Sequence, residues 1–457
     1  MFKKYQKIHF VGIGGIGMSG IAEILSNLGL TVTGSDLKRS AVTQRLSRRG
    51  IKIWIGHDRR HVEGAHVVVV SSAVDETNPE VREANRLGIP VVPRAEMLAE
   101  LMRLKYGIAV AGTHGKTTTT SLIAEVVNQA GLDPTMIIGG KVKSLRGNAR
   151  LGRGEFLVAE ADESDRSFLK LSPTIGVITN IDPEHLENYR NFDHLKKAFV
   201  DFANKVPFYG SVVCCVDHPV VKKILPKIVR PCVTYGERDA DYIASNIEQV
   251  KDRLSFEVIH QGQELGMIRL PMAGRHHAEN ALAAIAVGRE LDIPFSTIKN
   301  ALEGFRGIAR RFEVLHSGTP IVVDDYGHHP VEIAATISAA REGWPKSRII
   351  AVIQPHRFTR LRALFDEFVG ALKNADLILI MEVYPAGEKP IRGVTGERLC
   401  NAVRRQYPRK LVAYAPQALQ VITTLMPWCG DDDLILFLGA GDITKVAHAV
   451  AKRFTCR

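Results

Sequence analysis

Short apolar runs alternate with amphipathic stretches along the first hundred residues. Apolar runs over residues 8–11, 31–34 and 67–71 have the length and composition of buried strands, and a helical pattern begins at about Ser19. Strands separated by helical stretches assemble side by side into parallel sheets. The pattern therefore predicts a Rossmann-like α/β domain over residues 1–103.

A second alternating region begins near Gly107, where an apolar run leads into a glycine-containing loop and a helix. Further strands are predicted over residues 156–160, 174–180 and 211–216, and a helix over residues 278–291. Between residues 240 and 270 the polar pairs 251–252 and 261–262 interrupt alternating positions, which is typical of antiparallel hairpins. We predict a central α/β domain over residues 104–312, with a P-loop ATPase-type parallel sheet and added antiparallel hairpins.

The alternation resumes in the last third of the chain. Strands are predicted over residues 321–325, 348–353, 377–383 and 434–438. This region is predicted to form a C-terminal Rossmann-like domain over residues 313–457. A length of 457 residues supports about three domains, so the fold class expected is three α/β domains in series.

Charge and cysteine usage narrow the classes of function. Lys and Arg number 60 against 49 Asp and Glu, and the resulting charge of +11 favours phosphate-bearing partners. The basic residues form no long run, which argues against nucleic acid as a partner. The six cysteines form no CxxC pair, as is typical of reduced thiols. With no signal-peptide pattern and no apolar stretch of about 18 residues, we expect a cytoplasmic protein without membrane insertion.

The first glycine motif is GIGGIGMSG, which lies between a predicted strand and a predicted helix. Its glycines are Gly12, Gly14, Gly15 and Gly17. Glycine allows a tight turn and lets backbone N–H groups approach a diphosphate at the helix N-terminus. Asp36 follows the second strand, where a carboxylate can accept a hydrogen bond from a ribose hydroxyl. By itself the motif fits NAD as well as a UDP-sugar, or a tight turn that binds no ligand.

The second motif, GTHGKTTTT over residues 112–120, is more specific. It has two residues between its glycines where the P-loop pattern has four, but strand, loop, lysine and helix follow in P-loop order. Backbone amides can surround phosphates, Lys116 can neutralise the β and γ oxygens, and Thr117 can bind Mg²⁺. We interpret His114 as a residue that orients the loop backbone. The motif predicts an ATP site.

Polar residues follow the next two predicted strands. Glu160 and Asp162 lie in VAEADESD, and Asn180, Asp182 and His185 lie in TNIDPEH. Ligands bind at the carboxyl ends of strands in parallel sheets. A carboxylate and an imidazole beside a nucleotide could hold a second Mg²⁺, which would also reduce repulsion between ATP and an attacking carboxylate.

A dispersed fourth set contains histidines and arginines from the second half of the chain. Its members are His276, Asn280, Arg310, Arg311, the segment 324–330, His356, Arg357 and Arg360. One arginine fork suits a γ-phosphate or acyl-phosphate, and a second suits the carboxylate of a free amino acid. The turn-rich segments YPAGEKP and LGAGD, over residues 384–390 and 438–442, are interpreted as structural.

Taken in order, GIGGIGMSG, GTHGKTTTT, VAEADESD, TNIDPEH, GRHHAENALAA, RRFE, DDYGHHP and QPHRFTR resemble the Mur ligase family over residues 7–443. The resemblance is strongest to those members that add L-alanine to UDP-N-acetylmuramate in peptidoglycan precursor synthesis. It implies ATP and Mg²⁺ as cofactors, and a monomer or weak homodimer. The P-loop alone would suit any member of the superfamily, including folylpolyglutamate synthase.

The resemblance assigns residues to four binding functions. It implies UDP-sugar binding by Gly12, Gly14, Gly15, Gly17, Asp36, His57 and Ser71. It implies ATP binding by Gly112, Thr113, His114, Gly115, Lys116, Thr117, Thr118, Asn280, Arg311 and Asp324. It implies Mg²⁺ ligation by Thr117, Glu160 and His185, and amino-acid binding by Tyr326, His328, His356, Arg357 and Arg360. The catalytic residues implied are Lys116, Glu160, His185 and Arg311.

Two positions depart from the family pattern. His277 stands where the family usually has Asn, which makes Asn280 the safer choice for the adenine side. The carbamylated lysine of several sister ligases would fall near Phe199 and Val200, so no such modification is expected.

The chemistry that the resemblance implies has two steps. A carboxylate is a poor electrophile, so its oxygen is expected to attack the γ-phosphate of ATP and form an acyl-phosphate. The alanine amine then attacks, and Lys116, Mg²⁺ and Arg311 would stabilise the negative charge of the tetrahedral intermediate. Because water would destroy the acyl-phosphate, closure of the third domain is expected.

Three alternatives remain open from the sequence. A recycling ligase that adds a whole tripeptide to the same UDP-sugar would need a roomier pocket in the third domain. An NAD-dependent oxidoreductase would explain GIGGIG and Asp36 but not GTHGKTTTT. A P-loop switch protein would explain the second motif but not two glycine-loop domains in one chain.

Overall fold

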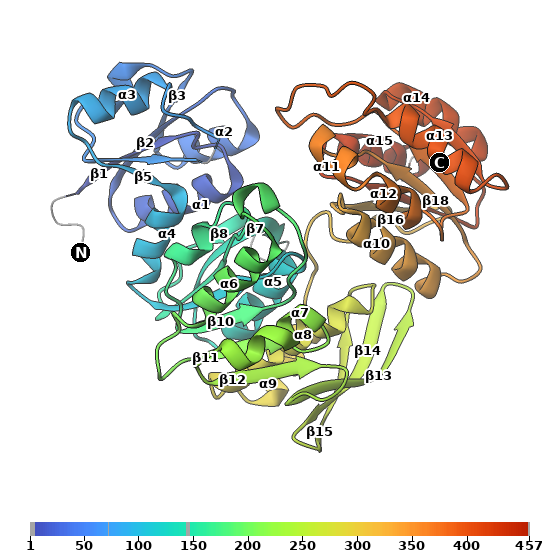
Figure 1. Cartoon of the computed structure of the whole chain (residues 1–457), viewed down its shortest axis with the longest axis horizontal. Helices are drawn as coiled ribbons and strands as arrows, with labels where there is room; N and C mark the ends of the chain where they lie inside the picture. Colours follow the sequence, from blue (N-terminus) through green and yellow to red (C-terminus); the bar gives the residue numbers. More distant parts are fainter. Residues whose placement is uncertain (1–4, 72, 143–146, 456–457) are drawn as a thin grey trace. The chain divides into compact units, whose positions relative to one another are not determined.

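A computed structural model describes residues 5–71, 73–142 and 147–455 (Figure 1). The chain divides into two compact units. The first contains Met1–Ser245, Glu257–Ile268 and Glu279–Arg306, and the second contains Asn246–Phe256, Arg269–Ala278 and Gly307–Arg457. Three sheets run through these units and correspond to the three predicted α/β domains. The exact boundaries at residues 103 and 312 stay predictions.

The first sheet is five-stranded and parallel, with the order β3-β2-β1-β4-β5. Its strands are β1 Lys7–Val11, β2 Thr31–Asp36, β3 Lys52–Ile55, β4 Val67–Val70 and β5 Val91–Pro93, and its helices are α1 Ile16–Asn27, α2 Ala41–Arg48, α3 Pro79–Arg86 and α4 Arg94–Met102. Val67 and Val69 pack in one core, whereas Val68 packs in another on the opposite face. The three predicted strands are confirmed, and α1 begins three residues before Ser19, directly after the glycine loop.

The central sheet has ten strands in the order β15-β14-β13-β12-β11-β10-β6-β9-β7-β8. The strands are β6 Tyr106–Ala111, β7 Thr135–Val142, β8 Gly147–Arg150, β9 Phe156–Glu160, β10 Ile175–Ile178, β11 Ser211–Cys215, β12 Cys232–Gly236, β13 Tyr242–Val250, β14 Arg253–His260 and β15 Gln263–Leu270. Its helices are α5 Lys116–Gln129, α6 Phe192–Ala203, α7 Pro219–Ile224, α8 His276–Glu290 and α9 Phe295–Glu303. β6 lies between β9 and β10 and pairs with both in parallel.

The predicted turns at residues 251–252 and 261–262 are confirmed. They connect β13 to β14 and β14 to β15, and Lys251, Gln261 and Gly262 have the positive φ angles of tight turns. β15 is the last strand in the order, and Gly266 in its middle has a φ of +133°. The antiparallel pair β7–β8 was not predicted.

The third sheet has six strands in the order β16-β17-β21-β18-β19-β20, parallel except for β16. The strands are β16 Glu313–His316, β17 Ile321–Asp325, β18 Arg348–Ile353, β19 Leu377–Ile380, β20 Leu411–Tyr414 and β21 Asp433–Leu438, and the helices are α10 Pro330–Gly343, α11 Phe358–Ala363, α12 Phe365–Ala371, α13 Gly396–Gln406, α14 Ala418–Leu425 and α15 Ile443–Thr455. Ile349 and Ala351 belong to one core, and Ile350 to the other. Both faces of β18 are covered, which explains its unbroken apolar sequence.

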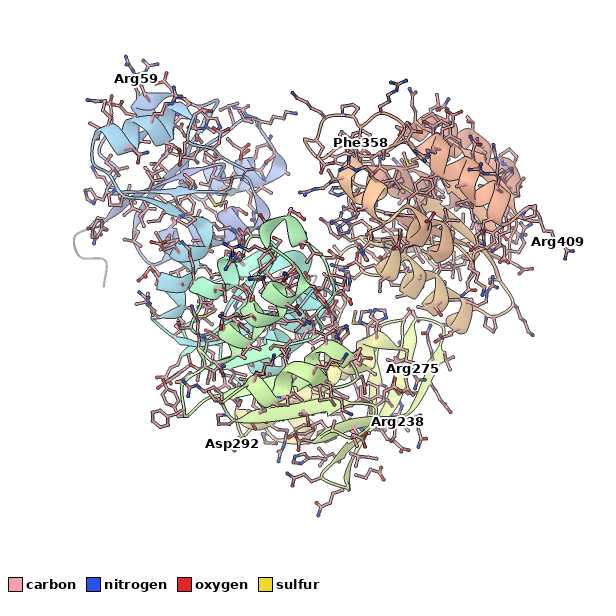
Figure 2. All side chains as sticks on the ribbon, in the orientation of Figure 1. Arg59, Arg238, Arg275, Asp292, Phe358 and Arg409 are labelled. Carbon is pink, nitrogen blue, oxygen red and sulfur yellow. The ribbon has the colours of Figure 1, made fainter. Side chains whose placement is uncertain are left out.

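Surface features agree with the composition. Arg59, Arg238 and Arg409 are exposed and come from distant parts of the sequence, so the positive charge is distributed along the chain (Figure 2). The cysteines within the described residues are free thiols, and Cys456 lies outside those residues. No helix in the described part of the chain combines the length and apolar character needed to cross a bilayer.

Candidate active site

The first glycine loop is held by the end of β2. The N–H groups of Gly12 and Ile13 donate to the carbonyl of Ser35 at 2.9 and 3.0 Å, and Gly14 N–H donates to Asp36 Oδ2 at 2.8 Å. A Cβ on Gly14 would lie 2.7 Å from the same Asp36 oxygen, so any larger residue would displace that carboxylate. Asp36 therefore fixes the loop as well as standing where a ribose hydroxyl could bind.

The other residues predicted for the UDP-sugar lie around this loop. Ser71 Oγ is 3.1 Å from the place that a Gly12 Cβ would occupy, and His57 Nδ1 is 3.0 Å from Ser35 Oγ. Arg94, which the sequence interpretation missed, also lies here: its Nη1 is 3.0 Å from the place of a Gly17 Cβ, at the first turn of α1, and its Nη2 is 3.6 Å from Asp162 Oδ2. Gly15 is the residue before the first residue of α1. The structure thus brings these residues together, and their role as a UDP-sugar site stays a prediction.

The second glycine loop lies between β6 and α5. Gly112 and Gly115 have φ angles of +146° and +80°. A Cβ on Gly112 would overlap Thr179 Oγ1 at 2.0 Å, and one on Gly115 would lie 2.8 Å from Asn280 Oδ1. Asn280 also accepts a hydrogen bond from Thr119 Oγ1 at 3.0 Å. Of the two positions considered in α8, Asn280 therefore packs against the loop, and its contact with the adenine stays a prediction.

Asn180 and Asp182 support the same loop from the end of β10. Asn180 Oδ1 accepts a hydrogen bond from His114 N–H at 2.7 Å, and Asp182 N–H donates to Thr113 Oγ1 at 2.8 Å. The His114 carbonyl accepts from Thr179 Oγ1 at 2.7 Å. The backbone of His114 is thus held by Asn180 and Thr179, and its interpretation as an orienting residue stays a prediction.

Lys116 is the first residue of α5, and its ammonium is surrounded by acceptors. Nζ donates to the carbonyls of Gly112 and Thr113 and lies 2.9 and 3.0 Å from the two carboxylate oxygens of Glu163. Burial lowers the pKa of Lys116, but the carboxylates of Glu163 and Asp162 more than offset this and raise it. Lys116 therefore remains a cation beside the loop, while Thr117 and the buried Thr118 continue the helix.

Glu163 is a buried carboxylate that the sequence interpretation missed. Its side chain is 3% exposed. Burial raises its pKa to about 7, Lys116 opposes the rise and Asp162 adds to it. Tyr189 Oη donates to the Glu163 carbonyl at 2.5 Å, which fixes the segment. No local pattern distinguishes Glu163 from its acidic neighbours in EADESD; only the contact with Lys116, 47 positions earlier, does so.

The residues predicted for Mg²⁺ come from three neighbouring strands. Thr117 follows β6, Glu160 ends β9 and His185 follows β10, and β9 and β10 flank β6. A hydroxyl, a carboxylate and an imidazole are suitable donors for a divalent cation beside phosphates. Glu160 Oε1 accepts from Gly139 N–H at 2.6 Å. The metal assignment stays a prediction.

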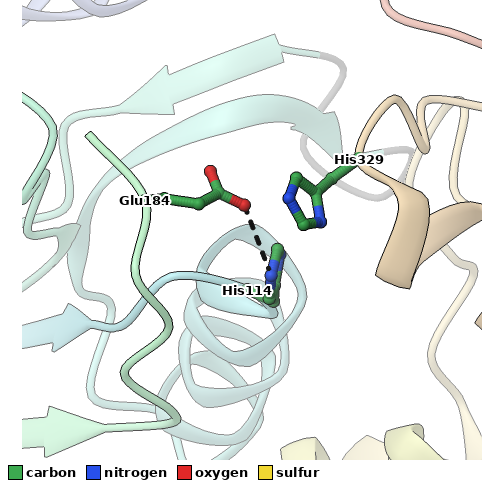
Figure 3. A group of neighbouring side chains, drawn as sticks. All are labelled: His114, Glu184 and His329. Atoms are coloured by element: carbon green, nitrogen blue, oxygen red, sulfur yellow. Dashed lines mark ion pairs between the residues drawn. The ribbon is translucent and has the colours of Figure 1, made fainter. Parts of the chain in front are cut away.

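Imidazoles and carboxylates alternate beside the second loop. His114 Nε2 lies 3.5 Å from Glu184 Oε1 (Figure 3) and 3.5 Å from Asp182 Oδ2. Glu184 Oε2 lies 3.6 Å from His185 Nε2, and Asp182 Oδ1 lies 3.3 Å from His218 Nε2. The P-loop histidine is thus linked to the segment that carries the predicted metal ligand.

In the second unit, the residues predicted for the amino acid form a row of rings. The ring of His328 makes edge contacts with Tyr326 at 5.2 Å and with His356 at 5.4 Å. His356 in turn stacks on Tyr384 at 5.6 Å with an interplanar angle of 9°. Tyr384 lies in YPAGEKP, which was interpreted as structural and therefore missed as a neighbour of this site.

Arg357 and Arg360 lie at the start of α11, beside His356. Arg357 has a φ of +71°, and its N–H donates to the Tyr384 carbonyl at 2.9 Å. Arg360 Nη1 lies 3.4 Å from His356 Nδ1. Burial, together with the charges of His328 and the two arginines, lowers the pKa of His356 to about 4. At neutral pH His356 is therefore uncharged, and the arginines supply the positive charge.

Arg310 and Arg311 both lie over the ring of Tyr326, with guanidinium carbons at 4.9 and 5.4 Å from its centre. Arg310 also donates to the Gly439 carbonyl in LGAGD and lies 3.5 Å from Asp324 Oδ2. Asp324 has no exposed surface and accepts from Thr444 Oγ1 at 2.6 Å. Its side chain is thus engaged within the second unit, and its predicted contact with the nucleotide stays a prediction.

The two departures from the family pattern also have definite environments. His277 is buried, and burial lowers its pKa well below the usual histidine value, so the ring is neutral. Phe199 is fully buried in the core of the first unit. The position where sister ligases carry a modified lysine therefore belongs to the packing of α6.

Sequence comparisons cover nearly the whole chain. Profiles described as Mur ligase family catalytic domain, Mur ligase middle domain, and Mur ligase glutamate ligase domain match residues 7–106, 110–288 and 310–441. A protein from Syntrophotalea carbinolica named UDP-N-acetylmuramate--L-alanine ligase is 52% identical over 454 residues, 99% of each chain. One of the same name from Geobacter sulfurreducens is 52% identical and covers 98% of each chain.

Solved structures with the same architecture include two informative neighbours. A UDP-N-acetylmuramate-alanine ligase from Thermotoga maritima superposes with a TM-score of 0.84 at 29% identity, over 98% of this chain and 99% of that one. A murein peptide ligase from Psychrobacter arcticus superposes at 0.71 with 23% identity over 98% of each chain, a likeness of fold alone. Since profiles for all three domains match in order and relatives align over the full length, the chain belongs to the Mur ligase family.

Proposed function

We propose that the chain is an ATP-dependent ligase that joins the carboxylate of UDP-N-acetylmuramate to the amine of L-alanine, as a step in making peptidoglycan precursors. The observation that carries this proposal is full-length identity of 52% to proteins named for that reaction. Two glycine loops, each between a parallel strand and a helix, support it, because they provide separate sites for two phosphate-bearing substrates.

The second loop and Lys116 supply the means for phosphoryl transfer. The carboxylate oxygen of the sugar attacks the γ-phosphorus of ATP, ADP leaves, and the product is an acyl-phosphate. The alanine nitrogen then attacks the acyl carbon, and inorganic phosphate leaves from the tetrahedral intermediate. Lys116 is a half-buried cation at the start of a helix, which suits it to neutralise charge that develops on transferred phosphoryl oxygens. Arg311, which lies in the second unit, is assigned the same task.

Mg²⁺ is part of the proposal, with Thr117, Glu160 and His185 as its protein ligands. Their donor chemistry and their origin at adjacent strand ends fit a divalent cation. When bound, the cation would offset negative charge on the phosphates. Glu160 and His185 also belong to segments whose neighbours, Asp162 and Asp182, carry further carboxylates.

For the amino acid, we assign the row of rings and the arginines beside it. Tyr326, His328 and His356 form one wall, and Arg357 and Arg360 provide guanidinium groups for the alanine carboxylate. Since His356 is neutral, it can accept a hydrogen bond without adding charge. We further propose a cytoplasmic location and a monomer or weak homodimer, as the family resemblance implies.

Phosphate release from ATP in the presence of UDP-N-acetylmuramate tests the proposal. L-Alanine, glycine, L-serine and the tripeptide would be compared as acceptors at equal concentration. We expect L-alanine to give the highest kcat/KM and the product to gain one alanyl residue by mass. Release that requires the tripeptide, or no release with any of the four, would refute the proposed reaction. Calorimetric titration of NAD against the UDP-sugar separates the oxidoreductase alternative, which requires saturable NAD binding.

A further inference from the structure

A buried carboxylate lies behind the first glycine loop and is not used by the reaction described above. Glu80, in the first turn of α3, has no exposed surface. Its Oε2 accepts from Ser35 Oγ at 2.5 Å and lies 3.3 Å from His57 Nδ1, and its Oε1 lies 2.6 Å from His61 Nδ1. His9 Nε2 lies 3.6 Å from Oε2. A carboxylate enclosed by three imidazoles and a hydroxyl needs a reason in the fold or in the function.

The hydrogen atoms in this cluster can be assigned from the donor inventory. The single hydrogen of the Ser35 hydroxyl is directed to Glu80, so Ser35 Oγ can only accept from His57 Nδ1, 3.0 Å away. Burial opposes ionisation of Glu80, but His9, Ser35 and His61 lower its pKa to about 2. The ionised carboxylate is also only an acceptor. Both neighbours of His57 Nδ1 are therefore acceptors, and Nδ1 must carry the proton.

The same residues hold the glycine loop. The Ser35 carbonyl accepts from Gly12 and Ile13, and the Asp36 carbonyl accepts from the N–H of Gly56 at 2.9 Å, next to His57. Glu80 therefore contacts Ser35, whose carbonyl fixes the backbone of the glycine loop. It also contacts His57, the histidine predicted to bind the UDP-sugar. His61 is held independently, because it also stacks on Trp54 at 4.6 Å.

We infer that Glu80 is a positioning residue of the UDP-sugar site, which fixes His57 in the Nδ1–H tautomer so that Nε2 offers a lone pair to a hydroxyl or imide N–H of the ligand. The identity of the ligand rests on the proposed function, whereas the tautomer does not. Both oxygens of Glu80 face hydrogen-bond donors, and glutamine would replace one oxygen by an NH₂ group, which is itself a donor. The substitution therefore disrupts the hydrogen bonds of Glu80 while keeping the volume of the side chain.

The tautomer is measured in the full-length wild-type protein without ligand. Histidines are labelled with ¹⁵N, spectra are recorded at about pH 8, above the ordinary histidine pKa, and the His57 signals are assigned by their loss in His57→Gln. We expect a protonated Nδ1 and an unprotonated Nε2. A ring protonated on Nε2, whether alone or together with Nδ1, overturns the inference.

Binding is then compared in Glu80→Gln and in a matched control, Glu83→Gln. Glu83 lies one turn along the same helix and pairs with Arg86 at the surface. In Glu80→Gln we expect the Kd for UDP-N-acetylmuramate to rise about 10-fold, the Kd for ATP to stay within about twofold of wild type, and His57 to lose its single tautomer. Glu83→Gln should match wild type in all three measurements.

The outcomes separate this inference from the proposed function. A folded Glu80→Gln with unchanged UDP-sugar affinity and an unchanged His57 tautomer overturns the role of Glu80. If wild type binds no UDP-N-acetylmuramate, the proposed function fails. The ligand-free spectra of wild type and Glu80→Gln still decide whether Glu80 sets the tautomer of His57. Should Glu80→Gln not fold by circular dichroism, the wild-type spectrum alone decides.

Discussion

The two glycine loops of this chain have the same backbone plan and opposite electrostatic surroundings. Each follows a parallel strand and precedes a helix, and each has a buried carboxylate behind or beside it. Glu80, behind the first loop, has its pKa lowered to about 2 by the side chains of His9, Ser35 and His61 in spite of burial. Glu163, beside the second loop, has its pKa raised to about 7 because burial outweighs the attraction of Lys116.

The difference agrees with the different tasks proposed for the two loops. Around Glu80 a hydroxyl and three imidazoles surround the carboxylate, which suits the proposed role of the first loop, to bind a substrate without transferring its phosphates. Around Glu163 a single ammonium, Lys116 Nζ, is shared between the Glu163 carboxylate and two backbone carbonyls. Lys116 therefore has partners that phosphate oxygens can replace, which suits a site where charge moves during the reaction.

Removing the cation of the second loop should have the largest effect. In Lys116→Ala we expect kcat to fall by about 10² to 10³, which corresponds to about 3 to 4 kcal/mol. The Kd for UDP-N-acetylmuramate, measured by calorimetry, should stay near wild type because the other loop is untouched. A variant that retains half its activity would contradict the separation of tasks between the loops. Lys197→Ala, an exposed lysine of α6, is the control.

Glu80→Gln should destabilise the fold at neutral pH. Since the folded pKa of about 2 lies below the model-peptide value of 4.5, ionised Glu80 stabilises the fold above pH 4.5, and this contribution disappears as the pH falls towards 2. At pH 7 the loss should be about 3 kcal/mol. Urea unfolding followed by Trp54 fluorescence, with Trp344 and Trp428 replaced by Phe, measures it near the site. If Glu80→Gln and Glu83→Gln have equal free energies of unfolding, Glu80 does not stabilise the fold as expected.

Glu163→Gln should act in the opposite direction and depend on pH. The raised pKa means that protonated Glu163 stabilises the fold below pH 4.5, and this contribution is lost as the pH rises through about 7. Glutamine stays neutral, so between pH 5 and pH 8 the variant should gain about 2 kcal/mol relative to wild type. Thermal midpoints at both pH values test this, with the exposed Glu155→Gln as control. If the difference in thermal midpoint between Glu163→Gln and wild type is the same at pH 5 and pH 8, Glu163 does not titrate between these pH values.

The smallest effect should come from a site that uses neither loop. Arg357→Lys keeps the positive charge but loses the planar pair of donors, so the KM for L-alanine should rise 10-fold or more, from about 1.5 to 3 kcal/mol per charged hydrogen bond. The KM values for ATP and the UDP-sugar should hardly change. Arg362→Lys, exposed on the same helix, is the control. A rise in the ATP KM alone would move the amino-acid site to Tyr326 and His328.

Sequence alone predicted the three α/β domains, the two glycine loops and the tight turns of the central hairpins, because these features are set by local patterns. The strand over residues 348–353, for example, is apolar throughout since helices cover both faces. Some strands of three or four residues, such as β5 and β8, were not predicted, because so few positions do not establish a period unless all of them are apolar.

Residues that act through distant partners were the ones missed. Glu80 follows Asn78-Pro79 and is typical of a helix start, and its burial depends on Ser35, 45 positions earlier. Arg94 and Tyr384 likewise are placed near predicted sites by their contacts with Asp162 and His356, respectively. No spacing rule connects such pairs, whereas glycine motifs carry both the turn and the ligand approach in consecutive residues.

The outermost strand β15 has a consequence for how copies of this protein meet. An open strand offers a row of backbone groups to any second chain in solution, and sheets that join in this way lead to aggregation. Glu264 and Arg269 place exposed charges along β15, and Gly266, with its φ of +133°, interrupts its regular geometry. Both features oppose edge-to-edge pairing, so the protein is expected to stay dispersed at high concentration, and a flat, uncharged β15 would make it prone to form fibres.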